Sequence, residues 1–126
     1  MISFDGFIME DGVPIYQQIL LYLKRGIIAG TIVSGDELPS RRVLSALLGV
    51  NPNTVQKAYR LLEEEGLIHS RSGAKSCVAA DEAAIRRLRG EILGLSLKTV
   101  IDAMKQMGMT LEDAQAALAD HWEVQP

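Results

Sequence analysis

Residues 40–62 read SRRVLSALLGVNPNTVQKAYRLL, and this stretch decides the fold. Ser40 predicts the N-cap of a short helix, and Gly49 predicts its end. Asn51 predicts the next N-cap, and Pro52 suits the first helical position because the amide hydrogen that proline lacks is not needed there. Two capped helices joined by a short turn that contains glycine predict a helix-turn-helix.

The apolar spacing gives each of these helices an inward and an outward side. In the first helix Leu44, Leu47 and Leu48 are expected to face inward. In the second helix the residues expected inward are Val55, Ala58, Tyr59 and Leu62, and those expected outward are Asn53, Gln56, Lys57 and Arg60.

The flanking segments complete a winged helix. Pro14 predicts the start of a preceding helix, which Gly30 ends. After the helix-turn-helix, residues 67–70 and 75–78 have the composition of two short strands with a glycine-containing turn between them. Residues 1–78 are therefore expected to form a winged helix-turn-helix DNA-binding domain.

The remaining residues, 79–126, predict a helical tail. One helix is expected from 81 or 82 to about 107, and the pair Thr110 and Asp113 predicts a capping box for a second one. Gly90 and Gly94 leave two alternatives open, a bend near Gly94 or a place where another helix approaches closely. The fold class is thus mostly α with a small β-hairpin, an N-terminal winged helix-turn-helix followed by a C-terminal two-helix segment.

The two tail helices carry more apolar surface than one helical hairpin can hide. We expect a second copy of the chain to bury this apolar surface, so that the tail is a dimerisation segment and the protein a homodimer. The residues expected to form this interface are Ile85, Leu88, Ile92, Leu95, Ile101, Met104, Leu118 and Trp122.

Charge is unevenly distributed along the chain. The net charge is −3, but residues 38–62 hold four basic side chains and no acidic one. A local basic face determines the local electric field more than the sum does. This segment therefore predicts a DNA-binding surface in a chain that is acidic overall.

The polar residues at the start of the second helix are the expected DNA contacts. In a helix-turn-helix this region enters the major groove, where asparagine and glutamine can pair with adenine and lysine can meet guanine or phosphate. A merely solvated helix face is the alternative, but capping accounts for Asn51 alone. The residues expected to contact DNA are Arg41, Arg42, Asn51, Asn53, Thr54, Gln56 and Lys57, with Arg71, Gly73 and Lys75 in the wing.

Other chemistry finds little support in the sequence. The chain has 126 residues, too few for a barrel enzyme or for a doubly wound sheet with a second domain. His69 and His121 lack ligand spacing, and His69 with Cys77 as a cross-strand neighbour would give only two zinc ligands. No enzyme activity, metal or cofactor is therefore expected, and the sequence identifies no small-molecule effector.

The expected location is the cytoplasm. A single cysteine cannot form an internal disulfide, which favours a reducing compartment. The chain has no apolar run long enough to span a membrane, and its first residues lack the pattern of a signal peptide. We therefore expect no membrane partner.

Residues 14–78 resemble the GntR transcription regulators, and within them the YtrA-like branch. The resemblance is carried by PIYQQI at 14–19, GDELPS at 35–40, GVNPNTV at 49–55 and AYRLLEEEGLI at 58–68. It implies a homodimeric, sequence-specific DNA-binding repressor, often encoded beside ABC transporters that it controls.

The resemblance also implies particular DNA contacts and shows where this chain departs from the family. The implied contacts are Arg42, Asn51, Asn53, Thr54, Lys57 and the wing glycine, Gly73. Val43 replaces the usual acid after Arg42, and Arg41 stands where an apolar residue is common. Ala74 and Lys75 replace a more usual basic residue and glycine in the wing.

The sequence thus predicts a repressor that binds a palindromic operator in double-stranded DNA. The alternative from another class is a winged helix that serves as a protein–protein adaptor without sequence-specific DNA binding. Steep salt dependence of binding to duplex DNA would favour the first, and no duplex binding at low salt would favour the second.

Overall fold

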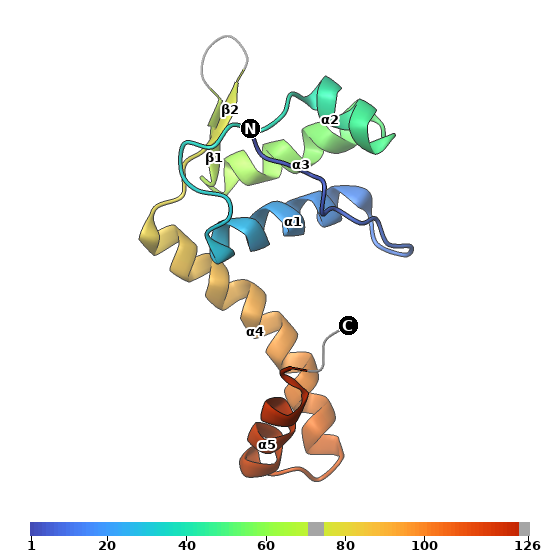
Figure 1. Ribbon diagram of the computed structural model, residues 1–126, viewed down its shortest axis with the longest axis vertical. Helices are drawn as coiled ribbons and strands as arrows, with labels where there is room; N and C mark the ends of the chain where they lie inside the picture. Colours follow the sequence, from blue (N-terminus) through green and yellow to red (C-terminus); the bar gives the residue numbers. More distant parts are fainter. Residues whose placement is uncertain (71–74, 124–126) are drawn as a thin grey trace. The chain divides into compact units, whose positions relative to one another are not determined.

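The computed structural model describes residues 1–70 and 75–123, in which it contains five helices and one two-stranded sheet. In chain order the elements are α1 (Ile15–Ala29), α2 (Arg41–Leu48), α3 (Pro52–Glu64), β1 (Ile68–Ser70), β2 (Ser76–Val78), α4 (Glu82–Gln106) and α5 (Leu111–His121) (Figure 1). This order confirms the predicted winged helix-turn-helix followed by two further helices.

The chain divides into two compact units, residues 1–88 and 89–126. The division falls within α4, which is a single helix from Glu82 to Gln106. A helix interruption at Gly94 is therefore not observed. Apart from the adjacent residues and the backbone of α4 itself, no described atom lies within 4 Å of the place where a Cβ would stand on Gly90 or Gly94. Residues 79–88 group with the winged helix, and the functional boundary after residue 78 stays a prediction.

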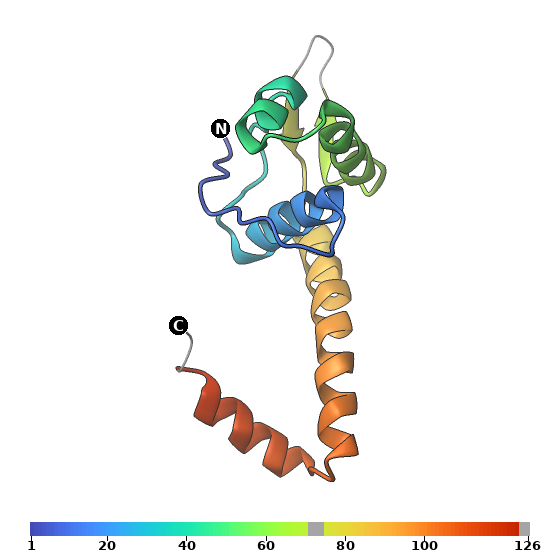
Figure 2. The same ribbon diagram turned by 90° about the vertical axis from the view of Figure 1, so that its right-hand side faces the viewer.

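The core of the first unit lies between α1, α2 and α3, which Figures 1 and 2 show side by side. Apolar side chains of the three helices and of the hairpin are removed from solvent there, and each contributes roughly 1.5–3 kcal/mol to folding. The core includes Ile19, Leu23, Ile27, Leu44, Val55, Ala58, Tyr59, Leu62, Leu67, Ile68 and Val78.

The predicted helix ends are confirmed by their hydrogen bonds. The Ser40 hydroxyl accepts from the Val43 amide at 3.1 Å, and the Asn51 side chain accepts from the Asn53 amide at 2.8 Å. Between the two helices Gly49 has a φ of +69°, a conformation that costs a residue with a Cβ more than it costs glycine. These local contacts fix the short turn of the helix-turn-helix.

The prediction that Leu47 faces inward is wrong, because its side chain is 64% exposed. Leu44 and Ser45 are the buried residues of α2. Successive helical residues are rotated by about 100°, so Leu47 lies about 60° beyond Leu44 on the side away from Ser45. Its three-residue spacing from Leu44 therefore takes it out of the narrow buried side of this eight-residue helix.

The hairpin is antiparallel and pairs Ile68 with Val78, His69 with Cys77 and Ser70 with Ser76. The expected cross-strand neighbours His69 and Cys77 are thus confirmed. The segment between α1 and α2 joins the outer edge of β2, where the Leu38 amide donates to the Ser76 carbonyl at 2.9 Å. This contact ties the start of the helix-turn-helix to the wing.

The second unit has no interior of its own. Among its described residues, 89–123, none is buried. α5 begins with the predicted capping box, in which the Thr110 hydroxyl accepts from the Asp113 amide and the Asp113 carboxylate accepts from the Thr110 amide. Figure 2 shows α5 diverging from the end of α4, so the apolar faces of these helices remain open.

Across the two described stretches, no helix combines the length and the apolar character of a transmembrane span.

Candidate nucleic-acid interface

The buried side of α3 fixes which of its residues face outward. Val55, Ala58 and Leu62 are fully removed from solvent against α1 and α2. Asn53 and Lys57 are exposed, and Thr54 and Gln56 are half-buried. The helix therefore presents to solvent the polar residues that the sequence predicted.

The Asn51 side chain has a structural task at the start of α3. Its oxygen accepts the Asn53 amide, and this hydrogen bond satisfies one of the free donors at the helix N-terminus. The Asn51 side-chain NH₂ group keeps its two donors, which can reach a phosphate or a base edge. The exposed Asn53 side chain, in the first turn of α3, keeps both a donor and an acceptor.

Two predicted contact residues are joined across the helix-turn-helix. Arg41 lies in the first turn of α2, and its Nη1 donates to Oε1 of Gln56 on α3. Arg41 and Arg42 are both exposed at this end of α2. The hydrogen bond joins α2 and α3 on the surface where the cations lie.

Below this surface, a hydrogen bond joins α3 to Pro39, the residue before the N-cap of α2. The Tyr59 hydroxyl donates to the Pro39 carbonyl at 2.6 Å in the buried interior. Burial raises the pKa of Tyr59 well above its ordinary value, and the positive charge of Arg41 partly opposes the shift. Tyr59 therefore stays a neutral donor at physiological pH.

Lys57 has a partner on α1 that the sequence prediction missed. Its Nζ lies 4.0 Å from the centroid of the Tyr16 ring, within the range of a cation–π interaction. The Gln17 side chain donates to the Tyr16 hydroxyl at 3.2 Å. The only signal for Tyr16 in the sequence was its place in the 14–19 motif, which implied no role for it.

In the wing, the structure describes one of the three predicted contacts. Arg71 and Gly73 lie outside the described residues. Lys75 is exposed, and its Nζ lies 3.2 Å from the Glu37 carboxylate. An exposed ion pair of this kind contributes little to stability, so Lys75 can exchange Glu37 for a phosphate at small cost.

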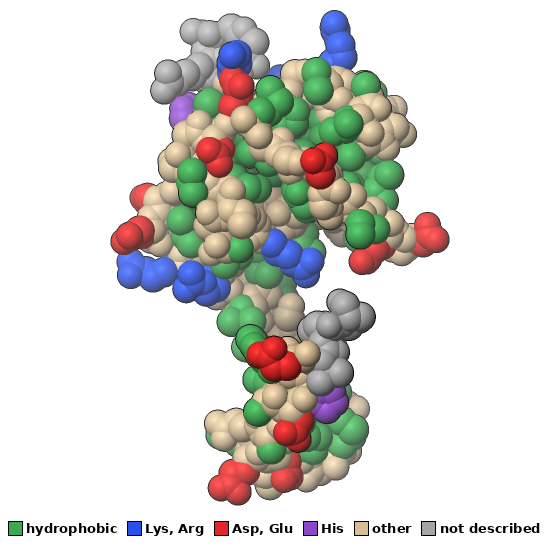
Figure 3. All heavy atoms as spheres, viewed as in Figure 1, with side chains coloured by type: hydrophobic (Ala, Val, Ile, Leu, Met, Phe, Trp, Pro, Cys, Tyr) green, Lys and Arg blue, Asp and Glu red, His purple; other side chains and the backbone are tan. Residues whose placement is uncertain are grey.

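Two acidic side chains at the C-terminal end of α3, Glu63 and Glu65, have partners outside the first turns of this helix. Lys24 of α1 holds the Glu65 carboxylate at 2.9 Å, and the Glu63 carboxylate accepts from the Ser70 amide at 3.3 Å. On the face shown in Figure 3, basic side chains lie above α2 and, next to an acidic one, beside the hairpin. The exposed basic side chains that the sequence predicted for residues 38–62 are thus Arg41 and Arg42 in the first turn of α2, and Lys57 and Arg60 further along α3.

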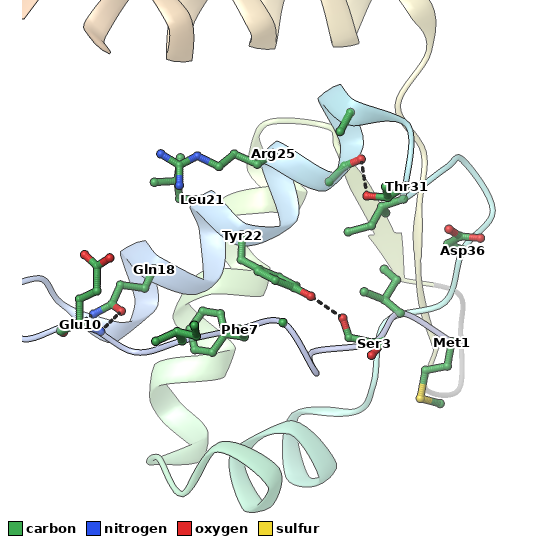
Figure 4. A pocket seen from close by; sticks show the side chains of 16 residues that line it. Met1, Ser3, Phe7, Glu10, Gln18, Leu21, Tyr22, Arg25, Thr31 and Asp36 are labelled. Atoms are coloured by element: carbon green, nitrogen blue, oxygen red, sulfur yellow. Dashed lines mark hydrogen bonds between the residues drawn. The ribbon is translucent and has the colours of Figure 1, made fainter. Parts of the chain in front are cut away.

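A separate hollow of about 790 Å³ lies between the N-terminal segment and α1 (Figure 4). Phe7, Tyr22 and Arg25 are among its lining residues. The Tyr22 hydroxyl donates to the Ser3 carbonyl at 2.7 Å, which holds the segment against α1. None of the predicted DNA contacts lines this hollow, so it is no part of the interface.

In the described part of the chain, no three histidine, cysteine or acidic side chains are grouped so that they could hold an ion.

The predicted dimerisation residues differ widely in exposure. Leu95 and Trp122 are 74% and 69% exposed, and Ile101 and Leu118 are exposed as well. Ile85, Ile92 and Met104 are half-buried. Leu88 is 3% exposed and belongs to the first unit, so a dimer would have almost nothing of this side chain left to cover.

Comparison with protein families places this arrangement among known regulators. The family model described as "Bacterial regulatory proteins, gntR family" matches residues 15–78, from α1 to the end of the hairpin. The "HTH-type transcriptional repressor YtrA" of Bacillus subtilis is 36% identical over 82% of this chain and 80% of its own length.

Solved structures show the same fold. A GntR family transcriptional regulator from Listeria monocytogenes superposes with a TM-score of 0.81 at 34% identity, over 89% of this chain and 98% of the other. AraR(DBD) in complex with operator ORX1 gives a TM-score of 0.50 at 30% identity, over 61% of this chain and 93% of the other.

Proposed function

The chain belongs to the GntR family of bacterial regulatory proteins, and from this premise we propose that it represses transcription as a homodimer bound to a palindromic operator. The relatives named above are transcriptional regulators rather than enzymes. The name of the Bacillus relative gives repression for that protein, and the AraR domain was solved with its operator. Both names support the same role for this chain.

The outward face of α3 is the observation that carries the proposal. In the first turn of α3, Pro52 and Asn53 are exposed; the turn is capped by Asn51 and contains no acidic side chain. In a helix-turn-helix the start of this helix inserts into the major groove. Asn53, Thr54 and Gln56 then read base edges, and Lys57 meets a phosphate or a guanine.

The arginines of α2 anchor the domain on the DNA backbone. Arg42 is exposed in the first turn of α2, where a cation opposes the helix dipole by about 0.3–1 kcal/mol. A phosphate beside it offsets this cost, and so does one beside Arg41. The wing adds Lys75, together with Arg71 and Gly73, as contacts to the backbone or the minor groove.

The exposed apolar side chains of the tail support the homodimer. Among the described residues, nine of the sixteen exposed large hydrophobic side chains lie between 93 and 122, a stretch in which none is buried. Pairing of two tails about a twofold axis covers these side chains, and the resulting dimer presents two copies of α3. The operator is then palindromic, with half-sites about one helical turn, or a simple multiple of it, apart.

The same proposal includes the target operon and the place where the protein acts. The likeness to the YtrA-like branch favours an operon for an ABC transporter as the target, repressed when the bound dimer blocks the promoter. The cytoplasm, where bacterial DNA lies, is the place of action. DNA binding through these side chains needs no cofactor.

The experiment begins with selection of bound sites from random duplexes by the full-length chain. Affinity for the selected duplex is then measured by fluorescence anisotropy over a salt series, for the wild type and for Arg42→Ala. Arg25→Ala is the matched control, because it removes the same charge from an exposed position on α1.

We expect the wild type to select a palindrome and to bind it less tightly as salt rises. Arg42→Ala is expected to bind about tenfold more weakly, with the salt slope reduced by about one, and Arg25→Ala to bind like the wild type. No duplex binding at low salt would overturn the proposal and favour the adaptor. Equal losses for both variants would show that only overall charge matters and would reject the assigned interface.

A further inference from the structure

The contact between Tyr16 and Lys57 joins two elements that are far apart in the sequence. Tyr16 lies in the first turn of α1 and Lys57 in the middle of α3. α1 and α3 are in contact, and Ile19 and Leu23 of α1 are buried, as is the inner face of α3. The backbones that carry the half-buried Tyr16 and the exposed Lys57 are therefore held side by side by this packing.

We propose that Tyr16 is a positioning residue for DNA binding, whose ring holds the Lys57 ammonium group in place for a phosphate oxygen. The inference deepens the proposed function and rests on it. It assigns a task to a residue of α1, outside the helix-turn-helix and the wing. Tyr16 acts through Lys57 and does not itself bind the DNA.

The geometry leaves the ammonium group free to bind an anion. The aromatic ring meets Lys57 from one side, at 4.0 Å from the ring centroid, and uses none of its three N–H donors in a hydrogen bond to an acid. Lys57 remains exposed. A phosphate can thus approach from the other side while the ring still touches the cation.

Lys57 and the wing lysine, Lys75, differ in their contact partners. Lys75 is paired with the Glu37 carboxylate, which a phosphate must displace. Among the described residues, the three ion pairs are Lys24–Glu65, Lys75–Glu37 and Lys98–Asp102, so no carboxylate neutralises Lys57 there. The ring orders the Lys57 side chain without cancelling its charge.

Ordering of this kind favours association. A free lysine side chain loses rotamer freedom when it binds a phosphate, which weakens the complex. A side chain already held over a ring has lost part of that freedom before the DNA arrives. Removal of the ring should therefore weaken DNA binding while the number of charges stays the same.

The test is a double-mutant cycle on the full-length chain with the selected operator duplex. Tyr16→Phe keeps the ring, Tyr16→Leu removes it, and each is combined with Lys57→Ala. We expect Tyr16→Leu to weaken binding about two- to fivefold and Tyr16→Phe to bind like the wild type. In the Lys57→Ala background, Tyr16→Leu should cause no further loss.

Two results would overturn the inference. Equal weakening by Tyr16→Leu with and without Lys57 would show that Tyr16 acts on DNA or on the fold by itself. Weak binding by Tyr16→Phe would show that the hydroxyl group, and not the ring, is what matters. If the wild type binds no duplex at all, that result rejects the proposed function itself. It differs from a failure of the inference, in which the wild type binds the operator but the cycle gives one of the two results above.

A second measurement needs no DNA and covers the case in which Tyr16→Leu is unstable. The ring current of Tyr16 shifts the NMR signals of the Lys57 side-chain ε protons upfield. We expect this shift in the wild type and in Tyr16→Phe. Unshifted ε protons in both proteins would mean that the contact is absent in solution, which would overturn the inference.

Discussion

The hydroxyl of Tyr59 on α3 donates a hydrogen bond of 2.6 Å to the carbonyl of Pro39, the residue before the N-cap of α2. This buried contact lies between the two helices of the helix-turn-helix. It connects the packed side of α3 with the start of α2, where Arg41 and Arg42 lie. The hydrogen bond therefore supports both the stability of the domain and the placement of its cations.

Tyr59→Phe is expected to destabilise the domain by about 1–3 kcal/mol, because it leaves the Pro39 carbonyl buried without its donor. Urea unfolding followed by circular dichroism measures this difference. Tyr22→Phe is the control, because the Tyr22 hydroxyl also donates to a carbonyl, that of Ser3, but in an exposed position. A loss for Tyr22→Phe as large as that for Tyr59→Phe would contradict the assigned importance of burial.

The raised pKa of Tyr59 predicts a loss of stability at alkaline pH. The unfolded chain loses the phenolic proton at about pH 10, whereas the folded protein keeps it to higher pH. The stabilising effect is complete below about pH 10 and falls as the pH rises toward the folded pKa. Between about pH 10 and pH 11 the wild type should lose up to about 1.4 kcal/mol more than Tyr59→Phe. Parallel pH profiles would contradict this.

Asn53→Ala is expected to relax the base preference of the protein and to leave the salt slope nearly unchanged. Asn53 carries no charge, and its exposed amide in the first turn of α3 is suited to a base edge. The preference for the selected half-site over single-base variants should fall by about 1–3 kcal/mol at one position. Competition binding with the variant duplexes measures it.

Asn53→Ala leaves the cap of α3 in place, because the Asn53 backbone amide that donates to the Asn51 side chain is unchanged. An unfolding free energy like that of the wild type, measured in urea, therefore separates base reading by Asn53 from the hydrogen bond that the Asn53 amide donates to Asn51. If Asn53→Ala selects sites as sharply as the wild type does, Asn53 does not read bases.

The local parts of the fold could be predicted because their signals lie within a few residues. Ser40, Asn51 and Thr110 each cap a helix by accepting an amide two or three positions along the chain. Such hydrogen bonds depend on the local sequence and need no knowledge of the packed core. The same holds for the turn at Gly49. The helix boundaries and the winged helix followed from these signals.

The remaining features depend on tertiary packing. Leu47 has the spacing of a buried leucine, but α3 covers only a narrow side of α2, and Leu47 lies outside it. The contact of Lys57 with Tyr16 joins α3 to α1, and Lys75 meets Glu37 from the loop before α2. No periodicity within one element encodes these partners. The sequence could propose the candidate residues Lys57 and Lys75, but it could not predict that their partners are Tyr16 and Glu37.

Leu95→Asp and Leu118→Asp, one on each tail helix, are expected to convert the proposed dimer into monomers. Both leucines are exposed in the single chain, so a buried aspartate would appear only in the dimer. Each change occurs twice at a twofold interface and should weaken association at least about 100-fold. Sedimentation velocity measures it, with Ile8→Asp as the control, because Ile8 is an exposed apolar residue that lies outside the tail. A monomeric wild type, or variants that remain dimers, would show that the tail does not join two copies through these leucines.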